Sequence, residues 1–128
     1  MTLVLTSFRR TLASLDRARE LPRDDLVRDA VVKRFEYCYE LSWKFIRRSL
    51  IESLGREAVD EVTRRDLFRM AAQHGLVSDP EDWFAYHTAR NETSHMYDED
   101  KANEIAALTD RFAIDARRLL GELERRNA

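Results

Sequence analysis

The sequence predicts an all-α fold, and three observations support this class. Hydrophobic residues make up 44% of the chain and charged residues 36%, which is typical of helical globular proteins and too apolar for a disordered chain. The 128 residues include only three glycines and two prolines, too few for the many turns of a β-sandwich or barrel. Apolar residues also recur at helical spacing. We therefore expect one domain, residues 1–128, folded as an antiparallel four-helix up-and-down bundle with one short extra helix.

Two helices account for the first part of the chain. Apolar residues at helical spacing predict an amphipathic helix over residues 3–20, after which a proline interrupts the pattern. Asp24 or Asp25 can cap a second helix. This helix should run to about Leu54, because Gly55 provides a C-terminal stop. Its apolar and aromatic residues cover more than one stripe, so we expect the central helix of the bundle, buried on two sides or at a dimer interface.

Two helix starts follow in the second half of the chain. Thr63 and Asp66 approximate a capping box, which opens a short helix that Gly75 stops. The sequence SDPED at residues 78–82 is a stronger start signal: a capping residue, a proline at the first helical position, and acids at the positive end of the helix dipole. The helix that begins there carries its aromatic residues towards Arg90.

The last helix is amphipathic throughout. Asp98 or Asp100 can cap it, and apolar residues then recur every three or four positions until about Arg126. Residues 56–62 are the one candidate loop, and we find no repeat or linker. The pattern does not fix where the preceding helix ends, between Arg90 and Asp98.

Charge and cysteine content limit the environment and the partners. Lys and Arg number 22 against 24 Asp and Glu, so the net charge of -2 does not indicate nucleic-acid binding, although a local basic patch is compatible with it. The single Cys38 excludes a disulfide or thiolate metal cluster within one chain and fits a reducing cytoplasm. The N-terminus lacks the apolar core of a signal peptide, and no apolar run approaches the roughly 20 residues of a membrane span. We expect a soluble, cytoplasmic protein.

Motifs for metals and cofactors are missing. The three histidines form no His-x-x-x-His pair, and the chain has neither a phosphate-binding P-loop nor a dinucleotide-binding glycine motif. We therefore expect no metal site and no cofactor. Ser94 precedes His95, but adjacent residues on a helix diverge by about 100° and no third orienting group is evident, which disfavours a serine nucleophile.

Residues 90–98, RNETSHMYD, concentrate the plausible chemistry. Arg90 is a permanent cation suited to a phosphate or carboxylate, His95 can exchange a proton near neutral pH, and Tyr97 offers a hydroxyl that could bind or be modified. On one straight helix Arg90 and Tyr97 would share a face, while His95 would point roughly 140° away from Arg90. Either the helix ends inside this stretch, or a second copy of the protein completes the site.

Arginine and histidine together suffice for one reaction. An arginine that neutralises a scissile phosphate and a histidine that moves a proton can cleave RNA without a metal, because the 2′-hydroxyl of the RNA is the nucleophile. The alternative is structural: Arg90 in an ion pair with an acid, and His95 bonding a helix end. Glu36, Glu40 and Lys44 form an i, i+4, i+8 row that can equally be a solvated charge stripe.

Several motifs together resemble a known superfamily. Arg90-x4-His95-x-Tyr97 is similar to the Arg-x(4–6)-His signature of the HEPN superfamily. Residues 34–44, RFEYCYELSWK, resemble the long-helix signature of its nucleotidyltransferase substrate-binding proteins, and so do residues 75–77, GLV, with Trp83 ahead of the Arg90-Asn91 pair. These matches span residues 34–98 in the right order, whereas the first and last helices match only in character.

The resemblance implies partners and an activity. It implies a homodimer in which the arginines and histidines of two protomers gather at one cleft, and a separate minimal nucleotidyltransferase encoded by a neighbouring gene. In related two-gene modules the HEPN protein is an RNA-cleaving toxin, and the nucleotidyltransferase silences it by transferring AMP to the motif tyrosine. A non-catalytic substrate-binding subunit of a two-component nucleotidyltransferase is the alternative, and a plain dimeric interaction module is a third possibility.

The same resemblance assigns roles by position. Arg90 would bind phosphate and His95 would act as acid and base. Asn91 would be a polar helper and Tyr97 the AMP acceptor. Helix facing alone suggests that Glu36 and Glu40 lie beside this site and orient Arg90 or His95.

Overall fold

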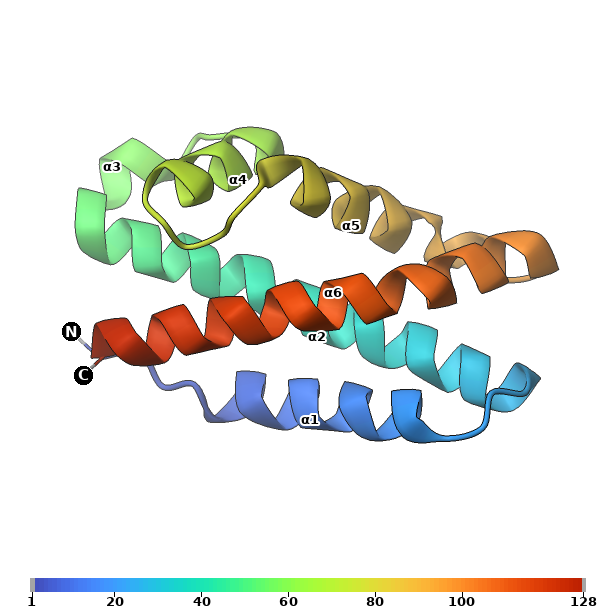
Figure 1. Ribbon diagram of the computed structural model, residues 1–128. Coiled ribbons are helices and arrows are strands. Elements are labelled where there is room, and N and C mark those ends of the chain that lie inside the picture. The colour runs from blue at the N-terminus through green and yellow to red at the C-terminus, as the bar shows by residue number, and fades with distance from the viewer. Residues whose placement is uncertain (1, 128) are drawn as a thin grey trace.

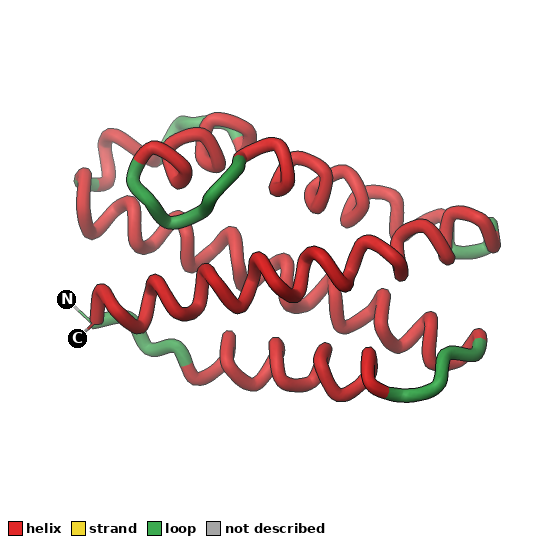
Figure 2. The backbone as a smooth tube through the Cα atoms, viewed as in Figure 1, coloured by secondary structure: helices red, strands yellow, loops and turns green. Residues whose placement is uncertain are grey.

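The regular structure of the protein is helical throughout the described part of the chain. The structure is a computed structural model that describes residues 2–127 (Figure 2). In chain order its elements are α1 (Thr6–Glu20), α2 (Asp25–Leu54), α3 (Arg56–Val59), α4 (Arg64–Gln73), α5 (Pro80–Glu92), the 3₁₀ turn η1 (Thr93–His95) and α6 (Glu99–Asn127). The predicted all-α class is confirmed.

Four long helices form the bundle. In Figure 1, α1, α2, α5 and α6 run alternately in opposite directions, and α2 lies at the centre in contact with α1, α4, α5 and α6. The turn η1 and the start of α6 lie at one end of the bundle, and both chain termini lie at the other. None of the helices in residues 2–127 is long and apolar enough to cross a membrane.

Local capping signals set the limits of α2 as predicted. The Asp24 carboxylate accepts a hydrogen bond of 2.8 Å from the Val27 N–H, which satisfies one free donor of the first turn. At the other end Gly55 has a φ of 87°, a left-handed value that glycine adopts without a Cβ clash, and its N–H donates to the Ile51 carbonyl.

The segment after Gly55 differs from its prediction. Residues 56–62 were expected to be a loop, but residues Arg56–Val59 form the single-turn helix α3. Its last residue, Val59, is 1% exposed and belongs to the hydrophobic core, so burial against α2 orders the turn. Asp60 then accepts a hydrogen bond of 2.6 Å from Arg47 on α2, which fixes the chain beyond the turn.

The caps of α4 and α5 also follow the sequence signals. Thr63 Oγ1 accepts from the Asp66 N–H at 3.1 Å, and Asp79 accepts from the Glu81 N–H at 2.9 Å ahead of Pro80. After α4, Gly75 has a φ of 76° and the chain turns back towards the core.

An aromatic cluster joins the helices. The ring of Phe112 on α6 makes edge contacts with Phe35 on α2 at 5.0 Å between centroids, and with Tyr86 and Trp83 on α5 at 5.1 and 6.0 Å. All four side chains are buried. Such perpendicular pairs are favourable beyond the burial of their area, so Phe112 fixes α5 and α6 against the central helix.

A polar clasp between Leu3 and Asn127 closes the end of the bundle that lies opposite η1. The Asn127 side chain accepts a hydrogen bond of 3.1 Å from the Leu3 N–H and donates one of 2.8 Å to the Leu3 carbonyl. Both bonds engage backbone groups that precede α1. The beginning of the chain is thereby held against the end of α6, as Figure 1 shows.

Candidate functional site

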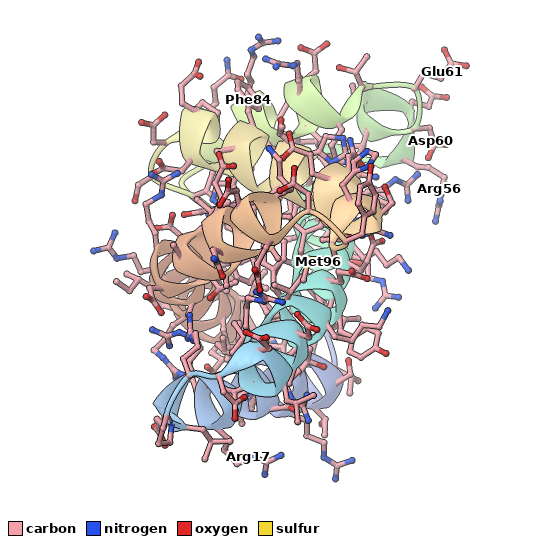
Figure 3. All side chains as sticks on the ribbon, turned by 90° about the vertical axis from the view of Figure 1, so that its right-hand side faces the viewer. Arg17, Arg56, Asp60, Glu61, Phe84 and Met96 are labelled. Carbon is pink, nitrogen blue, oxygen red and sulfur yellow. The ribbon has the colours of Figure 1, made fainter. Side chains whose placement is uncertain are left out.

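The motif stretch contains a helix end and a reversal of the chain. Helix α5 ends at Glu92, residues Thr93–His95 form the 3₁₀ turn, and the Asp98 N–H donates to the His95 carbonyl at 3.0 Å. The Asp98 carboxylate then accepts from the Lys101 N–H at 3.2 Å and caps α6. Figure 3 views this end of the bundle, with Met96 labelled near the centre. Of the two alternatives that the sequence left open, the first is observed, since the helix ends inside the motif and the chain turns.

Arg90 lies in the last turn of α5 and faces α2. Its Nε is 3.2 Å from Glu40 Oε1, and both side chains are 36% exposed. Glu40 is held in turn, because its Oε2 accepts a hydrogen bond of 3.1 Å from Trp43 Nε1. The Arg90 Nε is buried and forms no aligned hydrogen bond, so charge attraction holds the pair. Within residues 2–127 no hydrogen bond engages the two terminal Nη groups of Arg90, which leaves donors for a ligand.

His95 and Tyr97 are close together on the turn that follows. His95 Nδ1 is 3.3 Å from the Tyr97 hydroxyl, and the two rings meet edge to face with centroids 5.8 Å apart. Tyr97 is 84% exposed and His95 is exposed as well. Both groups are accessible from outside the bundle, either to a substrate or to another protein.

The remaining candidates are distributed around these residues. Asn91 is exposed on α5, next to Arg90. Glu36 Oε2 lies 3.5 Å from Lys33 Nζ on the same helix, α2. Among the described residues no hydrogen bond joins the side chains of Arg90 and His95; Arg90 pairs with Glu40, and His95 is beside Tyr97. Nor does any part of residues 2–127 gather three His, Cys, Asp or Glu side chains that could hold a metal ion.

A second polar network lies behind Arg90, and the sequence analysis missed it. The buried Tyr39 hydroxyl is 2.8 Å from His87 Nδ1 and accepts a hydrogen bond of 3.1 Å from Arg64 Nη1. Because the arginine can only donate, the hydroxyl proton goes to His87 Nδ1. The imidazole proton therefore sits on Nε2, 3.5 Å from Asn91 Nδ2; both of these nitrogens are donors, so the two side chains are neighbours without a hydrogen bond between these atoms.

The surroundings of this network keep His87 neutral. Burial lowers the pKa of His87, and the nearby positive charges of Arg64 and Arg90 lower this pKa further, while Glu40 opposes them. Burial also raises the pKa of Tyr39 to about 12. Near neutral pH both groups therefore act as uncharged hydrogen-bonding partners.

One sequence signal could have indicated part of this network. His87, Arg90 and Asn91 are spaced i, i+3 and i+4, so they share a face of α5. Tyr39 and Arg64 belong to other helices, and Tyr39 resembles an ordinary core aromatic in the sequence. Their convergence on His87 depends on tertiary packing.

The fold and the motif define the class of protein. A four-helix bundle with Arg-x4-His-x-Tyr at the turn between α5 and α6 has the features of a HEPN domain. A model of the family described as "Nucleotidyltransferase substrate binding protein like" matches residues 3–125, and the chain belongs to this family. The resemblance found from the sequence is confirmed.

Similar proteins agree with this assignment. A Haemophilus influenzae protein named "Probable ribonuclease HepT" is 36% identical over 113 residues, which cover 88% of this chain and 77% of that protein. A solved structure from Haemophilus influenzae, described as the fold of a substrate-binding domain of a nucleotidyltransferase, has a TM-score of 0.85 at 30% identity, with 94% of this chain and 99% of that one covered. A crystal structure from Thermus thermophilus follows with a TM-score of 0.77 at 28% identity, covering 91% and 98% of the two chains.

Proposed function

We propose that this protein is a homodimeric, metal-independent endoribonuclease of the HEPN type, a toxin that works with a separate minimal nucleotidyltransferase. The observation that carries the proposal is the state of the motif: Arg90 is anchored through Glu40 with its terminal nitrogens free of hydrogen bonds, while His95 and Tyr97 are exposed on the next turn. The similarity to a protein named as a probable ribonuclease supports the same conclusion.

The proposed reaction needs no group beyond these side chains and the RNA. The 2′-oxygen of one ribose attacks the adjacent phosphorus, and the bond from phosphorus to the 5′-oxygen of the next nucleotide breaks. One histidine accepts the proton of the 2′-hydroxyl and another acid protonates the departing 5′-oxygen. Arg90 neutralises the charge that develops on the phosphate oxygens. The products are a 2′,3′-cyclic phosphate and a 5′-hydroxyl.

A second copy supplies what one chain lacks. Each chain has one His95, and within the described residues its Arg90 forms no hydrogen bond with that histidine, so a dimer would provide two histidines and two arginines at one cleft. A groove of about 310 Å³ runs between α5 and α6 beside the motif. It is lined by Ala85, Thr88, Ala89, Glu92, Glu104, Ile105 and Leu108. Apart from Glu92 and Glu104, these side chains are small or apolar and permit close helix packing, and we assign this groove to the partner protomer.

The nucleotidyltransferase acts on Tyr97 in this proposal. The tyrosine oxygen attacks the α-phosphorus of ATP, the hydroxyl proton leaves, and pyrophosphate departs as AMP becomes attached. Tyr97 is 84% exposed, so the chain itself does not block the transfer. The new phosphate would lie beside His95, whose Nδ1 is 3.3 Å from the Tyr97 oxygen, and its bulk and negative charge would exclude RNA.

The test is cleavage of RNA in the presence of EDTA. Purified protein and the His95→Ala variant are incubated with total RNA, and the new ends are mapped. We expect 2′,3′-cyclic phosphate ends with the wild-type protein only. Absence of cleavage by folded, dimeric protein that carries no AMP would refute the nuclease activity.

The second candidate function is a non-catalytic substrate-binding subunit of a nucleotidyltransferase. The described role of the similar Haemophilus influenzae domain favours it. Expression in cells separates the two functions. A toxin should arrest growth when produced without its partner, and His95→Ala should abolish the arrest. A binding subunit should be harmless alone, and His95→Ala should then change only complex formation.

A further inference from the structure

Arg64 is an arginine that the proposed chemistry leaves unused. It is the first residue of α4, and its guanidinium carbon lies 3.6 Å from the centre of the Trp43 ring. Its Nη1 also donates to the Tyr39 hydroxyl. Stacking and a hydrogen bond together fix a planar group that would otherwise be flexible. Among the described residues no carboxylate pairs with Arg64, so its remaining N–H groups are available.

The neighbourhood of Arg64 is positively charged. The positive charges of Arg64, Arg90 and Arg65 lower the pKa of His87, and Glu40 opposes them. Asp60 lines the same hollow as Arg64 but is paired with Arg47. Arg64 and Arg65 also stand in the first turn of α4, where the helix dipole is positive and cations are unfavourable. The acid of that turn, Asp66, is paired with Arg69 at 2.9 Å. Such an excess of positive charge attracts an anion.

This charge is continuous with the motif. A chain of contacts leads from Arg64 on α4 through Tyr39 on α2 to His87 on α5. His87 in turn is next to Asn91, which is adjacent to Arg90 in the sequence. The network therefore links a second fixed guanidinium to the face of α5 that carries Arg90, the residue that would hold the scissile phosphate.

We propose that Arg64 binds a phosphate of single-stranded RNA that flanks the scissile phosphate. The inference rests on the proposed function, because the flanking position is defined by a phosphate bound at Arg90. A fixed guanidinium recognises the backbone and not the base, so the contact should add affinity without sequence preference. Arg64 is thus a substrate-positioning residue, distinct from the residues that would transfer protons.

The test measures how RNA binding depends on salt. The probe is a fluorescent oligoribonucleotide with 2′-methoxy groups, which has no 2′-hydroxyl and cannot be cleaved. Each phosphate contact on a single strand contributes about -0.7 to the slope of log Kobs against log salt concentration. We expect Arg64→Gln to reduce the magnitude of the slope by about 0.7 per bound site. Arg64→Lys keeps the charge and should keep the slope.

The chain offers a matched control. Arg48 also stacks on an aromatic ring, with its guanidinium carbon 5.0 Å from the centre of the Phe45 ring. Phe45 stacks on Phe8 of α1, so Arg48 lies on the α1 side of α2. Arg48→Gln should leave the slope unchanged. Arg64→Met, which can still cover the Trp43 ring, serves if Arg64→Gln does not fold.

The outcomes separate this inference from the proposed function. An unchanged slope for Arg64→Gln and Arg64→Met, together with His95-dependent cleavage by the wild type, would overturn the role of Arg64 alone. An unchanged slope with weakened nucleotidyltransferase binding would assign Arg64 to the protein partner and overturn the inference as well. If the wild-type protein does not bind the probe at any salt concentration, both the RNA substrate and the flanking contact are refuted.

Discussion

Tyr39→Phe removes one oxygen atom from the centre of the polar network. The ring of Tyr39 is fully buried and the substitution keeps its packing, so the hydroxyl is the only group lost. Arg64 is partly exposed and can turn its N–H to water, whereas His87 Nδ1 keeps a lone pair that faces the buried ring. An unsatisfied buried polar group costs about 1–3 kcal/mol, and we expect a loss of unfolding free energy in that range.

The assay is urea unfolding followed by circular dichroism at a fixed protein concentration. With an m-value of about 2 kcal/mol per M, the midpoint should fall by roughly 0.5–1.5 M. Tyr37→Phe is the matched control, because Tyr37 lies on the same helix, is 56% exposed and loses the same atom. Its unfolding free energy should change by less than about 0.5 kcal/mol.

A double-mutant cycle tests whether the hydroxyl acts through His87. Once His87 is replaced by Leu, no lone pair remains to be left unsatisfied, so Tyr39→Phe should cost less in that background. We expect an interaction free energy of about 0.5–2 kcal/mol between the two sites. Equal losses for Tyr39→Phe and Tyr37→Phe, or additive effects of the Tyr39 and His87 substitutions, would refute the network.

Three further predictions concern pH, assembly and the core. The pKa of His87 is lower in the folded protein than its unfolded value of about 6.5, so the unfolded state binds more protons. The unfolding free energy should therefore fall as the pH drops from about 6.5 towards the folded pKa. His87→Gln should remove that part of the pH dependence in urea titrations, and parallel wild-type and variant curves would contradict it. Leu108→Arg places a charge in the groove between α5 and α6 and should give a monomer in sedimentation analysis, whereas Ile114→Arg, at a 54% exposed position on the same helix, should not. Phe112→Ala should lower the unfolding free energy by about 3–5 kcal/mol in the same urea assay, because a ring packed between α2 and α5 leaves a cavity, and a loss below about 1 kcal/mol would argue against that packing.

Helix limits were predictable where a single residue and its near neighbours determine them. The cap of α2 at Asp24 and its stop at Gly55 depend on bonds within one turn, which the sequence displays directly. The turn α3 was not predictable in this way. The turn α3 is ordered because Val59 is buried against α2, and the residue pattern of segment 56–62 alone does not indicate that contact.

In the candidate site, too, the features formed by residues close in sequence were predictable, and those formed by tertiary packing were not. Arg90, His95 and Tyr97 lie within eight consecutive residues, and their chemistry could be inferred from residue types and from the family resemblance. The ion pair of Arg90 with Glu40 joins residues 50 positions apart in the chain. The structural alternative predicted an acid as the partner of Arg90, and helix facing suggested Glu40 as one candidate. Nothing in the sequence joins Tyr39 to His87, since a buried tyrosine usually serves the core.

The clasp between Leu3 and Asn127 has a consequence for handling the protein in the laboratory. It brings the two ends of the described chain together at the end of the bundle opposite the motif. Helix α6 has 29 residues and spans about 43 Å at 1.5 Å per residue, so that distance separates the clasp from the turn at His95. A fluorophore or a surface tether attached at either end would point away from the motif. Immobilised protein would therefore present Arg90 and Tyr97 to RNA and to the nucleotidyltransferase alike.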